Sequence, residues 1–93
     1  MTQTKRIISF VYDSTTGNII NIRNNTTIGK YVDGSILMKN LLLKCIMLNI
    51  CSDDTSTWSD NTIIRVSENM PDSLKKSICN ITHALSYEYE EIL

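Results

Sequence analysis

The chain has 93 residues, of which 42 % are hydrophobic and 20 % charged, and its formal net charge at pH 7 is −1. This composition is typical of a soluble globular domain and excludes the disordered class, in which low hydrophobicity is combined with high net charge. Because the chain is short for two domains, we expect residues 1–93 to form a single compact domain.

The cysteines and the apolar runs indicate a compartment. Cys45, Cys51 and Cys79 form no C-x-x-C pair, so neither a disulfide framework nor a structural zinc site is predicted. The start, MTQTKRIISF, is basic but lacks the apolar segment of a signal peptide. The longest apolar run, residues 36–51, is interrupted by lysines and asparagines and is too short to span a membrane. We expect a cytoplasmic protein without a membrane anchor, cofactor or metal.

The first expected element is a strand. KRIISFVYD, residues 5–13, is rich in β-branched and aromatic residues. Alternation places Ile8, Phe10 and Tyr12 on one face and Ile7 and Val11 on the other. Since both faces are mostly apolar, the pattern predicts an interior strand.

A β-hairpin follows in the predicted order. The loop STTGN contains Gly17 and Asn18, which suit positive φ, and IINIR then places Ile20 and Ile22 on one face. This pattern predicts two antiparallel strands joined by a loop of about five residues. Residues 27–32 are a candidate for a short third strand.

A helix is expected from Ile36 to Ile50, with Asp33 and Ser35 as candidate N-caps. On a helical projection its apolar side chains cover almost the whole circumference, and Asn40 and Lys44 form a narrow polar strip. One sheet face does not cover such a helix. We therefore expect a second apolar group to contact the last helix or a second copy of the chain. This group is Leu41, Cys45 and Leu48, on the side away from Ile36, Leu43, Met47 and Ile50.

The last part of the chain predicts a strand and a second helix. TIIRV, residues 62–66, reads as a strand with Ile64 and Val66 directed inward. Pro71 and Asp72 favour a helix start. The stripe that follows is the clearest helical periodicity in the chain: Leu74, Ile78, Ile81, Leu85, Tyr89 and Ile92.

The expected order is β-β-(β)-α-β-α, which predicts an α+β fold. A small antiparallel or mixed β-sheet, made of the hairpin and one or two further strands, would pack against two helices in two layers. This is the simplest arrangement that buries one stripe of each helix against one face of the sheet.

Charge is divided unequally along the sequence. Residues 1–50 hold six Lys/Arg against two acidic residues, whereas residues 51–93 hold three against eight. Such a division indicates an electrostatically selected partner if the sequence halves are also spatial halves. The pI of about 5.7 disfavours nucleic acid as that partner.

No catalytic or metal constellation is recognised. His83 is the only histidine, and it is predicted on the solvent side of the last helix with Lys76, Cys79, Tyr87 and Glu90. A Cys79 and His83 pair supplies two ligands, whereas a structural zinc site needs four. We expect a protein that is not an enzyme.

A partner site is predicted around the only tryptophan. SDDTSTWSDN, residues 52–61, places Trp58 among short polar residues, so it is either a lid on the core or a contact side chain. Glutamates in the last turns of a helix oppose its dipole, so either the helix end frays or the acidic end serves a basic partner. The predicted site comprises Trp58, Asp53, Asp54, Asp60, Tyr87, Glu88, Glu90 and Glu91.

These features predict a small binding protein of the immunity-protein or phage-inhibitor type. It would inhibit or neutralise another macromolecule, most simply a protein with a basic surface, by covering that surface with an acidic one. The alternative is a self-assembling homo-oligomer, in the simplest case a homodimer, joined through the apolar helix 36–50. A nucleic-acid-binding regulator is the third hypothesis.

Overall fold

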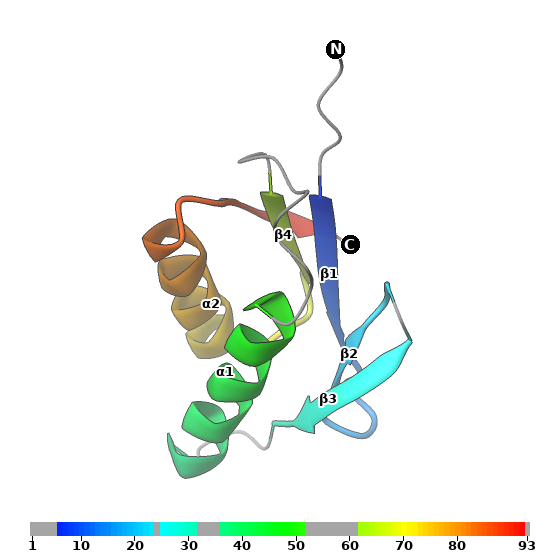
Figure 1. The fold of residues 1–93 in the computed structure, drawn as a ribbon. Coiled ribbons are helices and arrows are strands. Elements are labelled where there is room, and N and C mark those ends of the chain that lie inside the picture. The colour runs from blue at the N-terminus through cyan, green and yellow to red at the C-terminus, as the bar shows by residue number, and fades with distance from the viewer. Residues whose placement is uncertain (1–5, 24, 32–35, 52–61, 93) are drawn as a thin grey trace.

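The computed structural model describes residues 6–23, 25–31, 36–51 and 62–92, and of Cys51 the backbone alone. Within them, a five-stranded mixed sheet is covered on one face by two helices (Figure 1). The elements are β1 (Arg6–Tyr12), β2 (Asn18–Asn21), β3 (Thr26–Lys30), α1 (Ile36–Cys51), β4 (Thr62–Ser67), α2 (Asp72–Ala84) and β5 (Glu88–Ile92). The predicted α+β class is confirmed.

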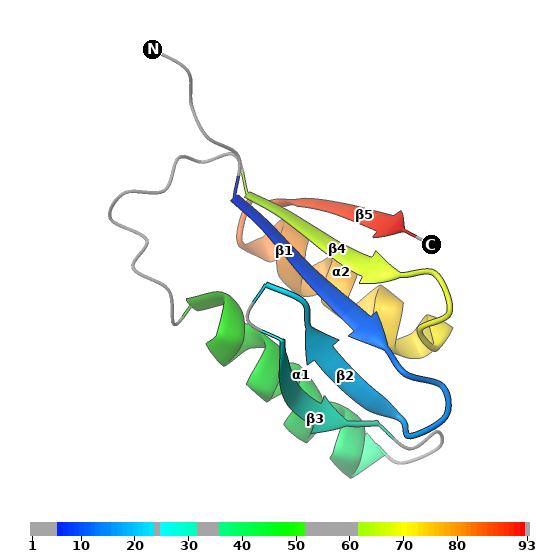
Figure 2. The same cartoon turned by 90° about the vertical axis from the view of Figure 1, so that its right-hand side faces the viewer.

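The strands lie in the order β3-β2-β1-β4-β5. β1 pairs antiparallel with β2 and parallel with β4, while β2 pairs antiparallel with β3 and β4 parallel with β5. Figure 2 shows α1 behind β2 and β3, and α2 behind β4 and β5. The two halves of the sequence therefore occupy two halves of the molecule.

β1 is the central strand, as its two apolar faces predicted. Ile8 and Phe10 point into the core, where Ile64 and Val66 of the neighbouring β4 join them. The buried cluster contains Ile8, Phe10, Ile19, Tyr31, Leu42, Ile46, Ile50, Ile64, Val66, Met70, Leu74 and Ile78. The core thus lies between the sheet and both helices.

The hairpin between β1 and β2 has the five-residue loop that the sequence predicted. Gly17 adopts φ +80° there, and its backbone N–H donates to the carbonyl of Asp13 at 2.7 Å. The Gly17 carbonyl accepts from the N–H of Tyr31 at 2.8 Å. One glycine therefore closes the loop and fixes the chain just after β3.

The C-terminal segment differs from the sequence-based expectation. α2 ends at Ala84, and the chain continues into strand β5 rather than into further helical turns. Ser86 adopts φ +62°, while the N–H groups of Ser86 and Tyr87 donate to the carbonyls of His83 and Thr82. This is a Schellman ending, in which a left-handed residue satisfies the last helical carbonyls. A serine fills the position that glycine usually occupies, so no glycine marks the end of the helix in the sequence.

A buried arginine joins the start of β1 to the end of α1. Arg6 is 1 % exposed, and its Nη2 donates to the carbonyl of Ile50 at 2.6 Å. Carbonyls in the last turn of a helix lack intrahelical partners and carry partial negative charge. The guanidinium therefore acts as a cationic C-cap supplied by a distant strand.

Candidate functional site

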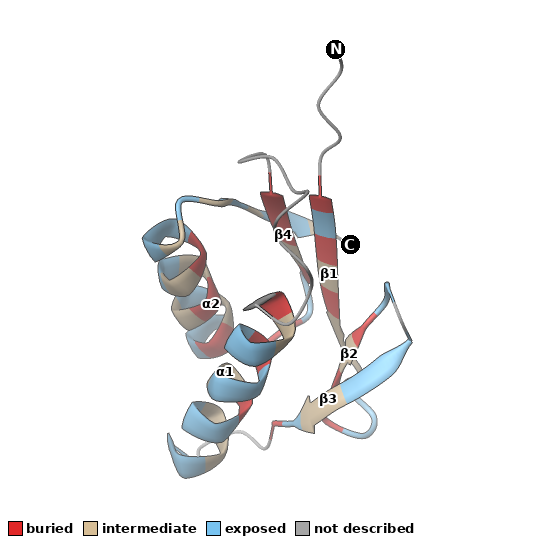
Figure 3. Ribbon diagram, viewed as in Figure 1, coloured by how far each residue is buried: buried red, intermediate tan, exposed pale blue. Residues whose placement is uncertain are grey.

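The most unusual surface of the molecule is the side of α1 that faces away from the sheet. In Figure 3 much of α1 is coloured as exposed, and its buried segments lie on the side next to the sheet. Of the α1 side chains that the structure describes, the exposed ones are Ile36, Leu37, Asn40, Leu41, Lys44, Cys45, Met47 and Leu48. We call this set the outer face of α1. All but the asparagine and the lysine are apolar.

Exposure on the outer face is extensive rather than marginal. Ile36, Leu37 and Leu48 are 76, 69 and 61 % exposed, and Leu41 is 52 % exposed. Scattered exposed leucines are normal on protein surfaces, but a contiguous apolar patch marks an interaction site. The buried side of the helix carries Leu42, Ile46 and Ile50 instead.

The apolar group predicted to contact the last helix or a second copy of the chain lies on the outer face of α1. Leu41, Cys45 and Leu48 are exposed, so α2 does not cover them, and that version of the prediction is wrong. A second copy of the chain stays a prediction. Ile36 and Met47, expected on the side away from this group, are exposed as well. The uncovered surface is therefore wider than the helical pattern indicated.

A groove borders the outer face where α1 lies against β3. It has a volume of about 320 Å³ and is lined by Thr26, Ile28, Cys45, Leu48 and Asn49. Its volume lies at the lower end of the range for sites that hold small ligands. None of these side chains is charged, which makes the groove suited to an apolar side chain.

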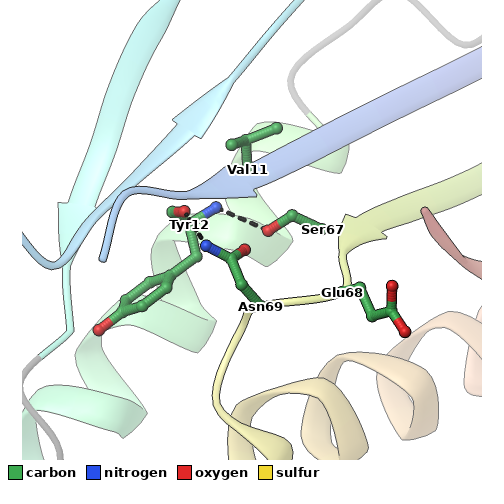
Figure 4. A pocket seen from close by; sticks show the side chains of 5 residues that line it. All are labelled: Val11, Tyr12, Ser67, Glu68 and Asn69. Carbon is green, nitrogen blue, oxygen red and sulfur yellow. Dashed lines mark hydrogen bonds between the residues drawn. The ribbon is translucent and has the colours of Figure 1, made fainter. Parts of the chain in front are cut away.

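A second groove lies at the carboxyl ends of β1 and β4. The connection from β1 leads to β2 on one side, whereas that from β4 leads through α2 to β5 on the other. Crevices at such switch points of a parallel pair commonly bind ligands. This groove has a volume of about 480 Å³ and is lined by Val11, Tyr12, Ser67, Glu68 and Asn69 (Figure 4). The sequence reading did not single out Glu68 or Asn69.

The polar groups of this second groove are directed at each other rather than at a common point. The backbone N–H of Tyr12 donates to Ser67 Oγ at 2.9 Å, and Asn69 Nδ2 donates to the Tyr12 carbonyl at 3.0 Å. In Figure 4 the Glu68 carboxylate and the Tyr12 ring point in different directions. The described residues contain no group of three His, Cys, Asp or Glu side chains that could hold a metal ion. The polar groups of this groove therefore do not converge on one point.

Only part of the predicted acidic site lies within the residues that the structure describes. Trp58, Asp53, Asp54 and Asp60 lie outside the described residues. The expectation that the C-terminal glutamates end a helix is wrong: Glu88, Glu90 and Glu91 lie on β5, at the edge of the sheet. Tyr87 precedes β5 and packs against the core. No helix dipole opposes these carboxylates, so that argument for a binding role no longer applies.

Two of the three glutamates form ion pairs within the chain. Glu90 pairs with Arg65 of the neighbouring β4. Glu91 Oε1 lies 2.6 Å from Lys75 Nζ, which also contacts Asp72 at 3.3 Å. The hydrogen bond with Glu91 raises the pKa of Lys75 above its ordinary value. These carboxylates are therefore partly neutralised before any partner arrives.

Tyr89, also on β5, packs against the core beside these charges. Burial raises the pKa of its phenol to about 12 from an ordinary value of 10.0, and the negative charge of Glu91 adds to this shift. Both effects disfavour the phenolate. The folded protein thus holds the Tyr89 proton more tightly than the unfolded chain.

This shift predicts a specific alkaline sensitivity. Because the pKa is raised on folding, the stabilisation is present below pH 10 and is lost as the pH rises toward about 12. Denaturant titrations at pH 9 and pH 11.5 should show a larger loss of unfolding free energy for the wild type than for Tyr89→Phe. Equal losses in the two proteins would show that Tyr89 titrates normally.

His83 is exposed, and its Nδ1 lies 3.8 Å from Cys79 Sγ on the same helix. Lys76 is exposed as well, as the helical projection predicted. Tyr87 and Glu90 do not join this strip, because α2 ends before them.

Acidic side chains are segregated in space as they are in sequence, although Arg65, Lys75 and Lys76 lie in the same half. The described elements β2, β3 and α1 contain Lys30, Lys39 and Lys44 but neither Asp nor Glu. The β4-α2-β5 half carries the acidic side chains of the described residues other than Asp13, namely Glu68, Asp72, Glu88, Glu90 and Glu91. The outer face of α1 thus belongs to the basic half.

The fold and these surfaces define a small α+β protein with an uncovered apolar helix on its basic side. Protein-family models, curated proteins and solved structures were compared with the chain, and none matches it. Among the described residues, no helix combines the length and apolarity needed to cross a membrane.

Proposed function

We propose that this protein acts by binding another macromolecule and that the outer face of α1 is its binding surface. The observation that supports the proposal is the set of large apolar side chains on this face, with Ile36, Leu37, Leu41 and Leu48 more than half exposed. Burying each such side chain contributes roughly 1.5–3 kcal/mol at most. A partner that covers several of them would therefore gain substantial affinity.

The test is to place a charge on the outer face. Leu41→Lys and Leu48→Lys should fold normally, because substitutions at exposed positions typically change stability by about 0.5 kcal/mol or less. Ile22→Lys is the matched control, since Ile22 is similarly exposed, at 54 %, but lies outside α1. Quantitative affinity capture from the source cells should retain a partner with the wild type and the control and lose it with both α1 variants. Identical capture by all four proteins would refute the proposal.

The homo-oligomer is a second candidate, because the same apolar face would serve it. Sedimentation velocity of the purified protein distinguishes the two. A self-associating protein would sediment as a dimer or larger species, and Leu41→Lys would convert it to a monomer. A wild type that is monomeric at all concentrations would leave the binding of a different macromolecule.

An inhibitor acting through an acidic surface is the other candidate. It is favoured by the exposed glutamates along the edge strand β5, although two of them already pair with Arg65 and Lys75. Glu88→Lys tests it best, because Glu88 is exposed and takes part in neither of those pairs. An inhibitor of this kind would act in the cytoplasm by binding alone and would not be an enzyme.

A further inference from the structure

We infer that the partner of the outer face of α1 presents an acidic amphipathic helix, with apolar side chains against the leucines and a carboxylate beside Lys44. This inference rests on the proposed function and adds the chemistry of the partner. An amphipathic helix laid in an apolar groove is a recurrent mode of recognition. α1 has 16 residues, so at a rise of about 1.5 Å per residue it offers a surface roughly 24 Å long.

The positive charge on the outer face of α1 favours a partner with negative charge. Lys44 is exposed and lies between Leu41 and Leu48, which are three and four residues away and therefore on the same side of the helix. The described residues of β2, β3 and α1 supply no Asp or Glu to pair with it. A partner that covers the leucines would also remove Lys44 from water. A carboxylate on the partner would offset the cost of that step most directly.

The groove beside the face provides the site for an anchoring side chain. Ile28 and Leu48 line its walls, and its volume is about 320 Å³. A helix packed along α1 would place its own leucine-like side chains into this groove at spacings of three and four residues. Shape and charge therefore favour the same kind of partner.

A second copy of the chain fits this surface poorly. A twofold axis places the same patch on both sides of an interface. The centre of α1 lies between Leu43 and Lys44, so a symmetric interface centred on this helix would bring Lys44 close to its own copy across the axis. A head-to-tail contact with the acidic half also fails, because no large apolar side chain is exposed on the described residues of β4, α2 or β5.

The test uses two labelled synthetic peptides of 16 residues, the length of α1. Both carry leucines spaced three and four apart, and these are flanked by glutamates in one peptide and by lysines in the other. Fluorescence anisotropy should show the glutamate peptide binding the wild type at least about tenfold more tightly than the lysine peptide. Lys44→Glu should remove this preference. Lys76 is an exposed lysine of α2 in the acidic half, and Lys76→Glu should preserve the preference.

The outcomes separate this inference from the proposed function. If both peptides bind equally well and Leu41→Lys abolishes both, the outer face is a binding surface but the inferred charge is wrong. If neither peptide binds, the inference is overturned. Sedimentation of the wild type and Leu41→Lys then determines whether a second copy covers α1 instead.

Discussion

Arg6→Ala is expected to lower the free energy of unfolding by about 3 kcal/mol. A hydrogen bond from a charged group contributes roughly 1.5–3 kcal/mol, and a partly buried cation at a helix C-terminus up to about 2 kcal/mol. Both apply to Arg6, which is 1 % exposed and donates to the Ile50 carbonyl at 2.6 Å. Its alanine variant would leave that carbonyl without the donor and a cavity beneath it. Urea denaturation followed by circular dichroism measures the loss.

Two further variants show whether the loss depends on the position of Arg6 and on its guanidinium group. Arg65→Ala removes an arginine from the neighbouring strand β4, but the ion pair of Arg65 with Glu90 is partly exposed. Such pairs contribute about 0–1 kcal/mol, so this variant should be close to the wild type. Arg6→Lys keeps the charge without the planar guanidinium and should fall in between. A loss at Arg6 no larger than that at Arg65 would show that the buried C-cap contributes little.

Gly17→Ala is expected to destabilise the protein by about 3 kcal/mol. Gly17 adopts φ +80°, and a Cβ at this position would lie 2.8 Å from the Tyr31 carbonyl oxygen. The left-handed conformation alone costs a non-glycine residue roughly 1–2 kcal/mol. The contact adds to this cost because the opposing atom is backbone and cannot rotate away. Thermal unfolding should show a lower midpoint for the variant.

Asn25→Ala is the matched control for Gly17→Ala. Asn25 also has positive φ, at 52°, but it is an exposed residue in the turn between β2 and β3. Alanine there should cost only about 1 kcal/mol, the conformational part of the penalty. Equal destabilisation at the two sites would mean that the approach of Tyr31 to Gly17 has no energetic consequence.

The parts of the fold that could be predicted from sequence are those in which local pattern and tertiary packing agree. Ile8 and Phe10 alternate with outward residues in β1, and Leu74 and Ile78 recur one turn apart in α2, so periodicity was sufficient for both. β5 was missed because Tyr89 and Ile92 continue the helical spacing of α2. The alternation of Tyr87 and Tyr89 with Glu88 and Glu90 carried the strand signal instead.

The candidate surface could be predicted only in part. The apolar pattern all round the helix indicated that one sheet face would not cover it. The pattern did not indicate which side of the helix would stay exposed. That depends on where β3 and α2 lie, and on Gly29, whose missing side chain lets Leu42 approach β3. The buried position of Arg6 had no sequence signal, because an arginine is rarely buried. Both features arise from contacts between distant segments.

The parallel pairing of β1 with β4 has a consequence for the order of folding. Tyr12 and Ser67, joined by a hydrogen bond at the end of this pair, are 55 positions apart in the chain. Closing so long a loop costs entropy before any contact is gained, whereas the β1-β2-β3 meander needs only short turns. During synthesis the meander and α1 emerge before β4 exists. The growing chain therefore carries an unpaired edge on β1, together with the uncovered helix, until the second half is made. That interval is when the protein is most exposed to aggregation and to capture by chaperones.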